Sequence, residues 1–318
     1  MGTKPQITGE LRQIPSARIR PNPDNPRVAF RQRELDELQE SIRRYGVQVP
    51  IAVYKSGSDY VLIDGERRWR CSLKLNLPTI PALVREEPSA LDNLLLMFNI
   101  HSLREQWDLL TIALKLPSVM GLLKKRLGKV PTEAELSSET GLARGVIRRC
   151  RILMDLPDKY KQLLLAEIKK PKSRQKLSED FFIELEKALR TVERAMPGLI
   201  TDKDAVRDLM INKYKSDVFK NITDLRLIPK IARAERVGGD VGQARSALKR
   251  LFSQPGSTIE EAFSSTVAAV YAERDLVSRI EGLTEKLSNA PEDFVDDDVR
   301  EQLEKLVEAA RLLLDAPQ

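Results

Sequence analysis

The alternation of apolar and polar residues divides the chain into a mixed N-terminal part and a long helical part. Within the first 85 residues, the β-rich runs Val49–Tyr54 and Tyr60–Ile63 flank a short polar segment, which predicts a hairpin. Apolar residues at helical spacing predict a helix over Arg31–Tyr45 and a second over Gly65–Leu75. A further apolar run predicts a short strand at Thr79–Val84. Because strands and helices alternate here, we expect a small α/β domain.

After residue 87 the apolar spacing is almost wholly that of helices. The expected helices are Ala90–Asn99, Glu105–Leu114, Ser118–Leu127, Glu133–Thr140, Ala143–Met154, Lys159–Ile168, at least three within 178–252, and two long ones at Ile259–Leu287 and Asp298–Leu314. Breaks that contain proline or glycine predict domains at 1–87, 88–176, 177–253 and 254–318. We therefore predict an α+β fold, in which a small α/β domain precedes helical domains.

Composition excludes several classes of protein. Cys71 and Cys150 are the only cysteines, so a disulfide framework is excluded and both are expected in the core. His101 is the only histidine, which leaves at most three Cys or His ligands for a zinc site. No apolar run is long enough to span a bilayer, and Met1–Glu10 lacks the apolar core of a signal peptide. We expect a cytoplasmic protein without membrane association.

The formal net charge of +6 hides a gradient along the chain. Residues 115–176 contain 16 Lys or Arg and 6 Asp or Glu, whereas residues 291–318 contain 3 basic and 9 acidic residues. A basic middle predicts a polyanionic partner such as nucleic acid. A solvated helical surface would have the same composition, so charge alone leaves both interpretations open.

Residues Thr132–Cys150 fit the pattern of a helix-turn-helix. Small Ser137 lies where the two helices touch, and Gly141 suits a tight turn in the left-handed conformation. The second helix, which enters the major groove in such domains, carries four arginines. They are Arg144, Arg148, Arg149 and Arg151. We expect the first two at base edges and the last two at phosphates; an ordinary helical hairpin with solvated arginines is the alternative.

Apolar residues at nearly helical spacing run along the predicted C-terminal helix. They are Ile259, Phe263, Val267, Val270, Val277 and Ile280. Such a stripe is typical either of a dimer seam or of a face that packs within one domain.

The segment Gly65–Arg70 begins a predicted helix directly after a strand. Free backbone N–H groups at a helix start, together with arginine side chains, form a ready site for phosphate. In the alternative, Glu66 caps the first turn and the arginines pair with nearby carboxylates.

These motifs together resemble the ParB family of chromosome and plasmid partition proteins, whose N-terminal domain is ParB/sulfiredoxin-like. The resemblance covers about Ile14–Leu156. Ile19–Arg27 looks like the family's first segment, and Gly46–Ile51 looks like its first nucleotide motif. Gly65–Arg70 matches its arginine box, and the helix-turn-helix follows at the expected distance. The order of these elements indicates the ParB fold.

The resemblance implies a clamp that binds CTP with Mg²⁺, recognises a palindromic site in double-stranded DNA and dimerises through its C-terminal part. It implies that Gly46 and Pro50 lie near the base. It implies that Gly65, Glu66, Arg67 and Arg68 hold the triphosphate. It also implies that Asn99 is a metal or phosphate ligand, and that the protein is associated with the nucleoid or a plasmid, where a ParA-type ATPase would be its partner.

The sequence departs from the family pattern at two motifs. Val49 precedes Pro50 where the family usually has Gln, which bears on the selectivity for the base. Phe98 stands where the third motif has an acidic residue, beside Asn99. Because Phe offers no oxygen ligand to Mg²⁺, we expect at most weak CTPase activity. No catalytic residue can be assigned from the sequence.

Two other functions are compatible with these motifs. One is a transcriptional regulator that uses the same scaffold and keeps a vestigial nucleotide site. The other is a nucleotide-dependent enzyme of the ParB/sulfiredoxin superfamily. The attached helix-turn-helix argues against a free-standing enzyme of small molecules.

Overall fold

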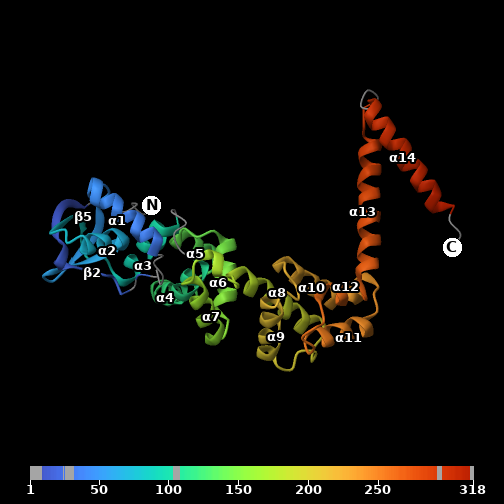
Figure 1. Cartoon of the computed structure of the whole chain (residues 1–318), viewed down its shortest axis with the longest axis horizontal. Helices are drawn as coiled ribbons and strands as arrows, with labels where there is room; N and C mark the ends of the chain where they lie inside the picture. Colours follow the sequence, from blue (N-terminus) through green and yellow to red (C-terminus); the bar gives the residue numbers. More distant parts are fainter. Residues whose placement is uncertain (1–8, 24, 26–31, 103–107, 292–295, 316–318) are drawn as a thin grey trace. The chain divides into compact units, whose positions relative to one another are not determined.

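The computed structural model describes residues 9–23, 25, 32–102, 108–291 and 296–315. Internal contacts divide the chain into two compact units. Unit 1 comprises residues 1–190 and 214–225, and unit 2 comprises residues 191–213 and 226–318. Strands occur in the N-terminal part and helices fill the remainder, so the predicted α+β class is confirmed (Figure 1). The division into four domains stays a prediction.

The N-terminal part of unit 1 is built on a five-stranded mixed sheet of order β1-β5-β3-β4-β2. Its strands are β1 (Glu10–Pro15), β2 (Ile19–Arg20), β3 (Ile51–Ser56), β4 (Asp59–Asp64) and β5 (Thr79–Arg85). The β3–β4 pair is the antiparallel hairpin that the sequence predicts, and β3 runs parallel to β5. The buried side chains of Ile51, Val53, Leu62 and Ile80 form the centre of the sheet core.

Strand β1 was not expected from the sequence. It pairs antiparallel with β5 at one edge of the sheet, and of its residues only Ile14 is buried. A solvated edge strand needs no apolar run, so the hydrophobic pattern gives no signal for it.

Two helices, α1 (Gln32–Tyr45) and α2 (Glu66–Lys74), pack against each other beside the sheet. Leu35, Ile42 and Cys71 form their shared core, and Trp69 of α2 packs against the sheet core. The expectation that Cys71 is buried is therefore confirmed. Burial raises the pKa of the Cys71 thiol.

The helical remainder of unit 1 follows the predicted order. Its helices are α3 (Ala90–Ser102), α4 (Leu109–Leu127), α5 (Glu133–Thr140), α6 (Arg144–Met154), α7 (Asp158–Ile168) and the start of α8 (Glu179–Ala195). One expectation was wrong: Leu109–Leu127 is a single helix with Pro117 inside it, where two helices were predicted. Pro117 has no backbone N–H and therefore cannot make its helical hydrogen bond. The buried side chains of Leu116 and Val119, on either side of it, stabilise the helix through packing.

Unit 2 has its own apolar core and its own helices. They are the end of α8, α9 (Lys203–Lys215), α10 (Leu227–Ala232), α11 (Val241–Leu251), α12 (Ile259–Ser264), α13 (Ala268–Ser288) and α14 (Asp297–Leu314). Ile228, Ile231, Leu248 and Ile259 are fully buried at its centre. No helix in the described ranges is long and apolar enough to cross a membrane.

The expected single helix Ile259–Leu287 was wrong, because the chain leaves the helical conformation between α12 and α13. Val267 has φ −123° and ψ −1°, and its side chain is fully buried. The predicted apolar stripe is thereby divided. Ile259 and Val267 pack within unit 2, whereas Val277 and Ile280 on α13 are exposed.

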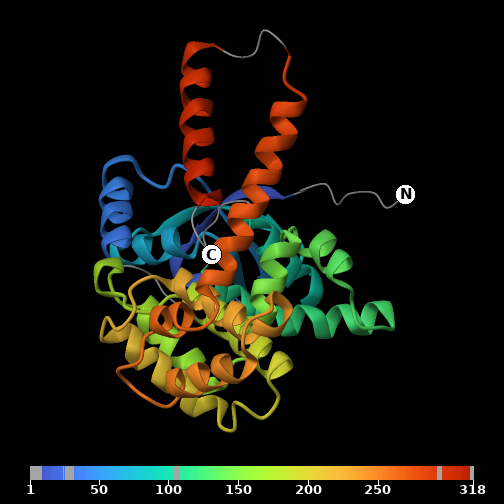
Figure 2. The ribbon, with the colours of Figure 1, turned by 90° about the vertical axis from the view of Figure 1, so that its right-hand side faces the viewer.

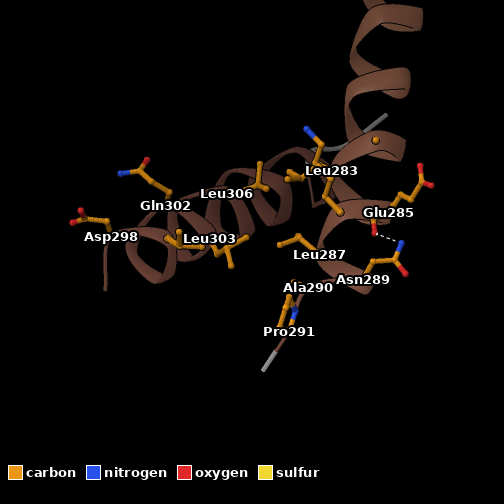
Figure 3. Close-up of a pocket in the computed structure, with 13 residues that line it drawn as sticks. Leu283, Glu285, Leu287, Asn289, Ala290, Pro291, Asp298, Gln302, Leu303 and Leu306 are labelled. Carbon is orange, nitrogen blue, oxygen red and sulfur yellow. Dashed lines mark hydrogen bonds between the residues drawn. The ribbon is translucent and has the colours of Figure 1, made fainter. Parts of the chain in front are cut away.

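Helix α13 leads away from α12, as Figures 1 and 2 show, and α14 follows it in the sequence. Neither helix contains a buried residue. Leu283 and Leu287 of α13 and Leu303 and Leu306 of α14 line an apolar groove of about 960 Å³ (Figure 3).

A buried lysine joins α9 to the loop that follows α11. The side chain of Lys213 is 1% exposed, and its Nζ donates to the carbonyl oxygens of Leu251 at 2.8 Å and Ser257 at 2.6 Å. It also donates to Ser257 Oγ at 3.0 Å. Desolvation by burial lowers the pKa of Lys213 to about 8 from 10.5, although the carboxylate of Glu261 acts in the opposite direction.

The lowered pKa of Lys213 predicts a pH-dependent stability. Between pH 8 and 10.5 the unfolded chain keeps a proton on this amine that the folded chain has released, so the free energy of unfolding rises with pH. We expect wild type to gain about 2 kcal/mol relative to Lys213→Met between pH 8 and pH 9.5. Urea denaturation followed by circular dichroism at both pH values measures this change. A difference between the two proteins that does not vary with pH would contradict it.

Candidate nucleotide and DNA sites

Gly65 makes the turn from β4 into α2. Its φ is +95°, in the left-handed region that favours glycine. A Cβ at this position would lie 2.6 Å from Cγ2 of Ile51 in the sheet core. The helix therefore begins close against the sheet only because residue 65 has no side chain.

Arg68 connects the first turn of α2 to the segment before β3. Its Nη1 donates to the carbonyl oxygens of Val49 and Pro50, both at 2.6 Å, and its Nη2 donates to Asp64 Oδ2 at 3.0 Å. The Arg68 and Asp64 side chains are 16% and 12% exposed. This guanidinium thus holds the Gly46–Pro50 segment beside the start of α2.

The other charged residues of the arginine box also have partners. Arg70 donates from Nη2 to Glu66 Oε1 at 2.6 Å, and Asn25 Nδ2 donates to Glu66 Oε2. Arg67 donates from Nη2 to the carbonyl oxygen of Glu34 at 3.0 Å. Pairing with nearby carboxylates is the arrangement that the second interpretation of this motif predicts. The N-cap residue of α2 is Gly65, which has no side chain to make a capping hydrogen bond. The assignment of Glu66, Arg67 and Arg68 to a triphosphate stays a prediction.

The segment assigned to the base begins where α1 ends. Gly46 has φ +71°, and its backbone N–H donates to the carbonyl oxygen of Ile42 at 2.9 Å. Strand β3 begins at Ile51, two residues later than predicted, so Val49 and Pro50 belong to the loop. Val49 is 58% exposed. An exposed valine at this position offers an apolar contact in place of the amide that glutamine would offer.

The third motif lies on α3, and its first residue faces the core. Phe98 is fully buried, so this position offers no group to a bound nucleotide. Asn99 donates from Nδ2 to the carbonyl oxygens of Leu95 at 2.9 Å and Glu139 at 3.1 Å. Asn99 therefore ties α3 to the end of α5. The side chain of His101 lies outside the described residues.

No cluster of three or more His, Cys, Asp or Glu side chains able to hold a metal occurs among the residues that the structure describes. The assignment of Asn99 as a metal ligand stays a prediction.

The helix-turn-helix begins with a complete capping box at α5. Thr132 Oγ1 accepts from the backbone N–H of Glu135 at 3.2 Å, and Glu135 accepts from the backbone N–H of Thr132 at 2.7 Å. Hydrogen bonds from Lys129 and Thr132 lower the pKa of Glu135 to about 2. Gly141 has φ +73° in the turn, and Ser137 Oγ donates to the carbonyl oxygen of Leu142 at 2.7 Å. The predicted turn is thus present in detail.

Four buried side chains form the core between the two helices. Leu136, Leu142, Ile147 and Cys150 are buried at 0–5% exposure. Burial raises the pKa of the Cys150 thiol to about 12. This thiol is therefore a packing group.

The four arginines of α6 differ in their surroundings. Arg144 is exposed and has no ion-pair partner in the described part of the chain. Arg148 pairs with Glu133 through Nη1 and Oε1 at 3.0 Å, and Arg149 pairs with Asp180 of α8. Arg151 is partly buried. Their roles at base edges or phosphates stay predictions.

Most ion-pair partners of the arginines on α2 and α6 were not predicted from the sequence. Asp64 could have been found, because Asp64 and Arg68 are four residues apart at a helix start. Glu34, Glu133 and Asp180 are far from their partners in sequence, so no local pattern reveals them.

Comparison with known proteins identifies the family of this chain. The family described as ParB N-terminal domain matches residues 3–98. The probable chromosome-partitioning protein ParB of Pseudomonas putida is 30% identical over 240 residues, which cover 73% of this chain and 78% of that protein. The chain belongs to the ParB family. The chromosome-partitioning protein ParB of Caulobacter vibrioides is 30% identical over 162 residues, 50% of this chain and about half (51%) of that relative's length.

Two solved ParB structures are also similar to this chain. The C-terminally truncated Caulobacter crescentus ParB complexed to the centromeric parS site has a TM-score of 0.43 and 23% identity, and covers 70% of this chain and 98% of its own. The same truncated protein complexed with CTP-gamma-S has a TM-score of 0.29 and 27% identity, and covers 57% and 99%.

The contact between Gly65 and Ile51 predicts an unequal cost of alanine at two glycines. Gly65→Ala adds both left-handed strain and a 2.6 Å contact, whereas Gly57→Ala adds only strain, because Gly57 has φ +61° and open space around it. We expect Gly65→Ala to lower the free energy of unfolding by about 1–3 kcal/mol more than Gly57→Ala. Thermal denaturation of both variants measures the difference. If both variants lose the same free energy of unfolding, the Ile51 side chain moves aside at no energetic cost and the prediction is wrong.

Proposed function

We propose that this ParB-family chain acts in plasmid or chromosome partition. Its helix-turn-helix recognises a DNA site, and CTP bound in its N-terminal domain controls a DNA clamp. The observation that carries the proposal is the helix-turn-helix itself: a capped α5, a glycine turn and an α6 on which Arg144 is exposed and pairs with no acidic residue that the structure describes. Membership of a family whose relatives are named for chromosome partitioning supports it.

The DNA contacts follow from the faces of α6. Ile147, Cys150 and Leu153 form its buried face, so Arg144 and Arg148 lie on the outer face within one turn of each other. In a helix-turn-helix the N-terminal residues of this helix meet base edges in the major groove. We assign Arg144 and Arg148 to bases, and Arg149 and Arg151 to phosphates.

The DNA assignment predicts a specific loss in Arg144→Ala. We expect binding to the preferred site, selected by the wild-type protein from random-sequence DNA, to weaken by about 1–3 kcal/mol. Lys172→Ala, in the exposed turn Lys172–Arg174, should instead weaken binding to all duplexes slightly and reduce the salt slope by about 0.9. Fluorescence anisotropy over a salt series measures both. Unchanged affinity of Arg144→Ala for the preferred site would contradict the assignment.

The nucleotide assignment is supported by the donors around the start of α2. Backbone N–H groups after Gly65 and the guanidinium groups of Arg67 and Arg68 fit an anionic polyphosphate. The nucleotide would be CTP, with its base near Gly46 and Pro50 and its triphosphate at Gly65, Glu66, Arg67 and Arg68. Mg²⁺ would neutralise the phosphates, taking most of its oxygen ligands from the nucleotide and water, with Asn99 as the protein ligand.

Burial of Phe98 argues for slow turnover, because no acidic side chain occupies this position of the third motif. We expect calorimetry to detect CTP binding with Mg²⁺, and phosphate-release assays to detect little or no hydrolysis. Arg67→Ala should abolish binding, whereas Arg70→Ala, on the same helix and paired with Glu66, should retain it. Arg67 is the better test than Arg68, because Arg68 also holds Val49 and Pro50. Rapid hydrolysis would refute the role given to Phe98.

The C-terminal helices are our proposed dimerisation element. Exposed apolar residues, among them Leu276, Val277 and Ile280, run along α13, and Leu306 and Val307 lie on α14. A two-fold dimer would match a palindromic DNA site. A ParA-type ATPase is the further partner that the proposed partition role implies.

A transcriptional regulator with a vestigial nucleotide site is the second candidate. The pairing of Arg67, Arg68 and Arg70 with groups of this chain favours it, because a nucleotide must replace some of these partners. If the wild-type protein binds none of CTP, ATP and GTP in the presence of DNA, the regulator is the better description of its function.

A further inference from the structure

The acidic residue Glu133 contacts an arginine on the outer face of α6. Glu133, the first residue of α5, accepts a hydrogen bond from Arg148 Nη1 at 3.0 Å. The two residues are 15 positions apart, and the turn of the motif brings them together. The Glu133 side chain is 25% exposed, whereas the Arg148 side chain is 66% exposed. The carboxylate is therefore the fixed partner and the guanidinium the solvent-facing one.

The geometry leaves donors of Arg148 for a second partner. A guanidinium carries five N–H donors in a planar fork, and Glu133 takes a hydrogen bond from Nη1. Arg148 lies opposite the buried face of Ile147 and Cys150, so its remaining donors face outward from α6. Guanine presents two acceptors, O6 and N7, in the major groove, and arginine binds them as a pair.

We propose that Glu133 is a positioning residue that holds Arg148 toward a guanine edge and away from DNA phosphates. The inference rests on the proposed recognition of DNA by α6. At a matching site the ion pair is kept while the free donors bind guanine, so the side chain is already ordered when DNA arrives. Because Glu133 holds the remaining donors toward the base edges, Arg148 reaches a backbone phosphate at other sequences only by leaving Glu133. The carboxylate therefore widens the gap between specific and non-specific binding.

Arg149 and Asp180 provide an internal comparison. Their ion pair joins α6 to α8, and both side chains are well exposed, at 42% and 64%. Arg149 is assigned to a phosphate, which every DNA sequence offers. Asp180 therefore competes with DNA for Arg149 equally at all sequences. Glu133 competes for Arg148 only at sequences that lack the guanine.

The test measures the full-length protein by fluorescence anisotropy on two duplexes of equal length. One carries the site that wild type selects from random-sequence DNA, and the other is its scrambled counterpart. We expect Glu133→Gln to lower the ratio of specific to non-specific affinity by about fivefold. We also expect a salt slope on the scrambled duplex that is steeper by about 0.9, because Arg148 becomes free to contact a phosphate. Asp180→Asn should raise affinity for both duplexes alike and leave the ratio unchanged.

Two controls separate positioning from charge and from folding. Asp158→Asn removes an exposed carboxylate that pairs with Lys161 of the same helix, α7, and should leave the ratio unchanged. In an Arg148→Ala background, Glu133→Gln should have no further effect on the ratio. An unchanged ratio in Glu133→Gln, an equal fall in Asp180→Asn, or an effect that survives in the Arg148→Ala background would overturn the inference. Failure of wild type to bind either duplex would instead contradict the proposed function.

Discussion

The N-terminal half of the molecule depends on one residue that has no side chain. At Gly65 the chain leaves a sheet strand and enters a helix within a single left-handed step, directly against Ile51. Because the step is so short, the first turn of α2 lies beside the end of β4, and Arg68 can reach Asp64 and the carbonyl oxygens before β3. The contacts of the arginine box therefore require a glycine at position 65. Through these contacts, Arg68 in turn holds the loop that follows α1.

Much of this structure could be predicted from the sequence, because local patterns determine it. The helix-turn-helix was predicted with its glycine turn and with Ser137 at the contact between its two helices, since each is a short-range feature. Features decided by distant contacts were not predicted. Strand β1 exists through its pairing with β5, and α4 continues through Pro117 because the residues on both sides are buried. The break at Val267 likewise reflects a side chain drawn into the core of unit 2.

The candidate sites show the same division between local and distant information. The motifs identify which residues are charged, but the partners of those charges are set by tertiary structure. On α2 the arginines are bound to groups of the chain itself, so a triphosphate at the proposed site would have to replace some of these partners. On α6 the first arginine has no ion-pair partner among the described residues, so DNA can bind it without displacing one of them. Asn99 links the two regions, because its helix carries the third motif while its amide bonds to the end of α5.

The two buried thiols give this chain a built-in pair of chemical reporters. Cys71 lies between α1 and α2, and Cys150 lies inside the helix-turn-helix, both fully covered and both with a raised pKa. An alkylating reagent reacts with the thiolate and needs access to it, so each cysteine is modified only when its own surroundings open. The rates of modification at the two positions therefore report separately on the opening of the α1–α2 core and of the helix-turn-helix core. No label or added cysteine is needed for that measurement.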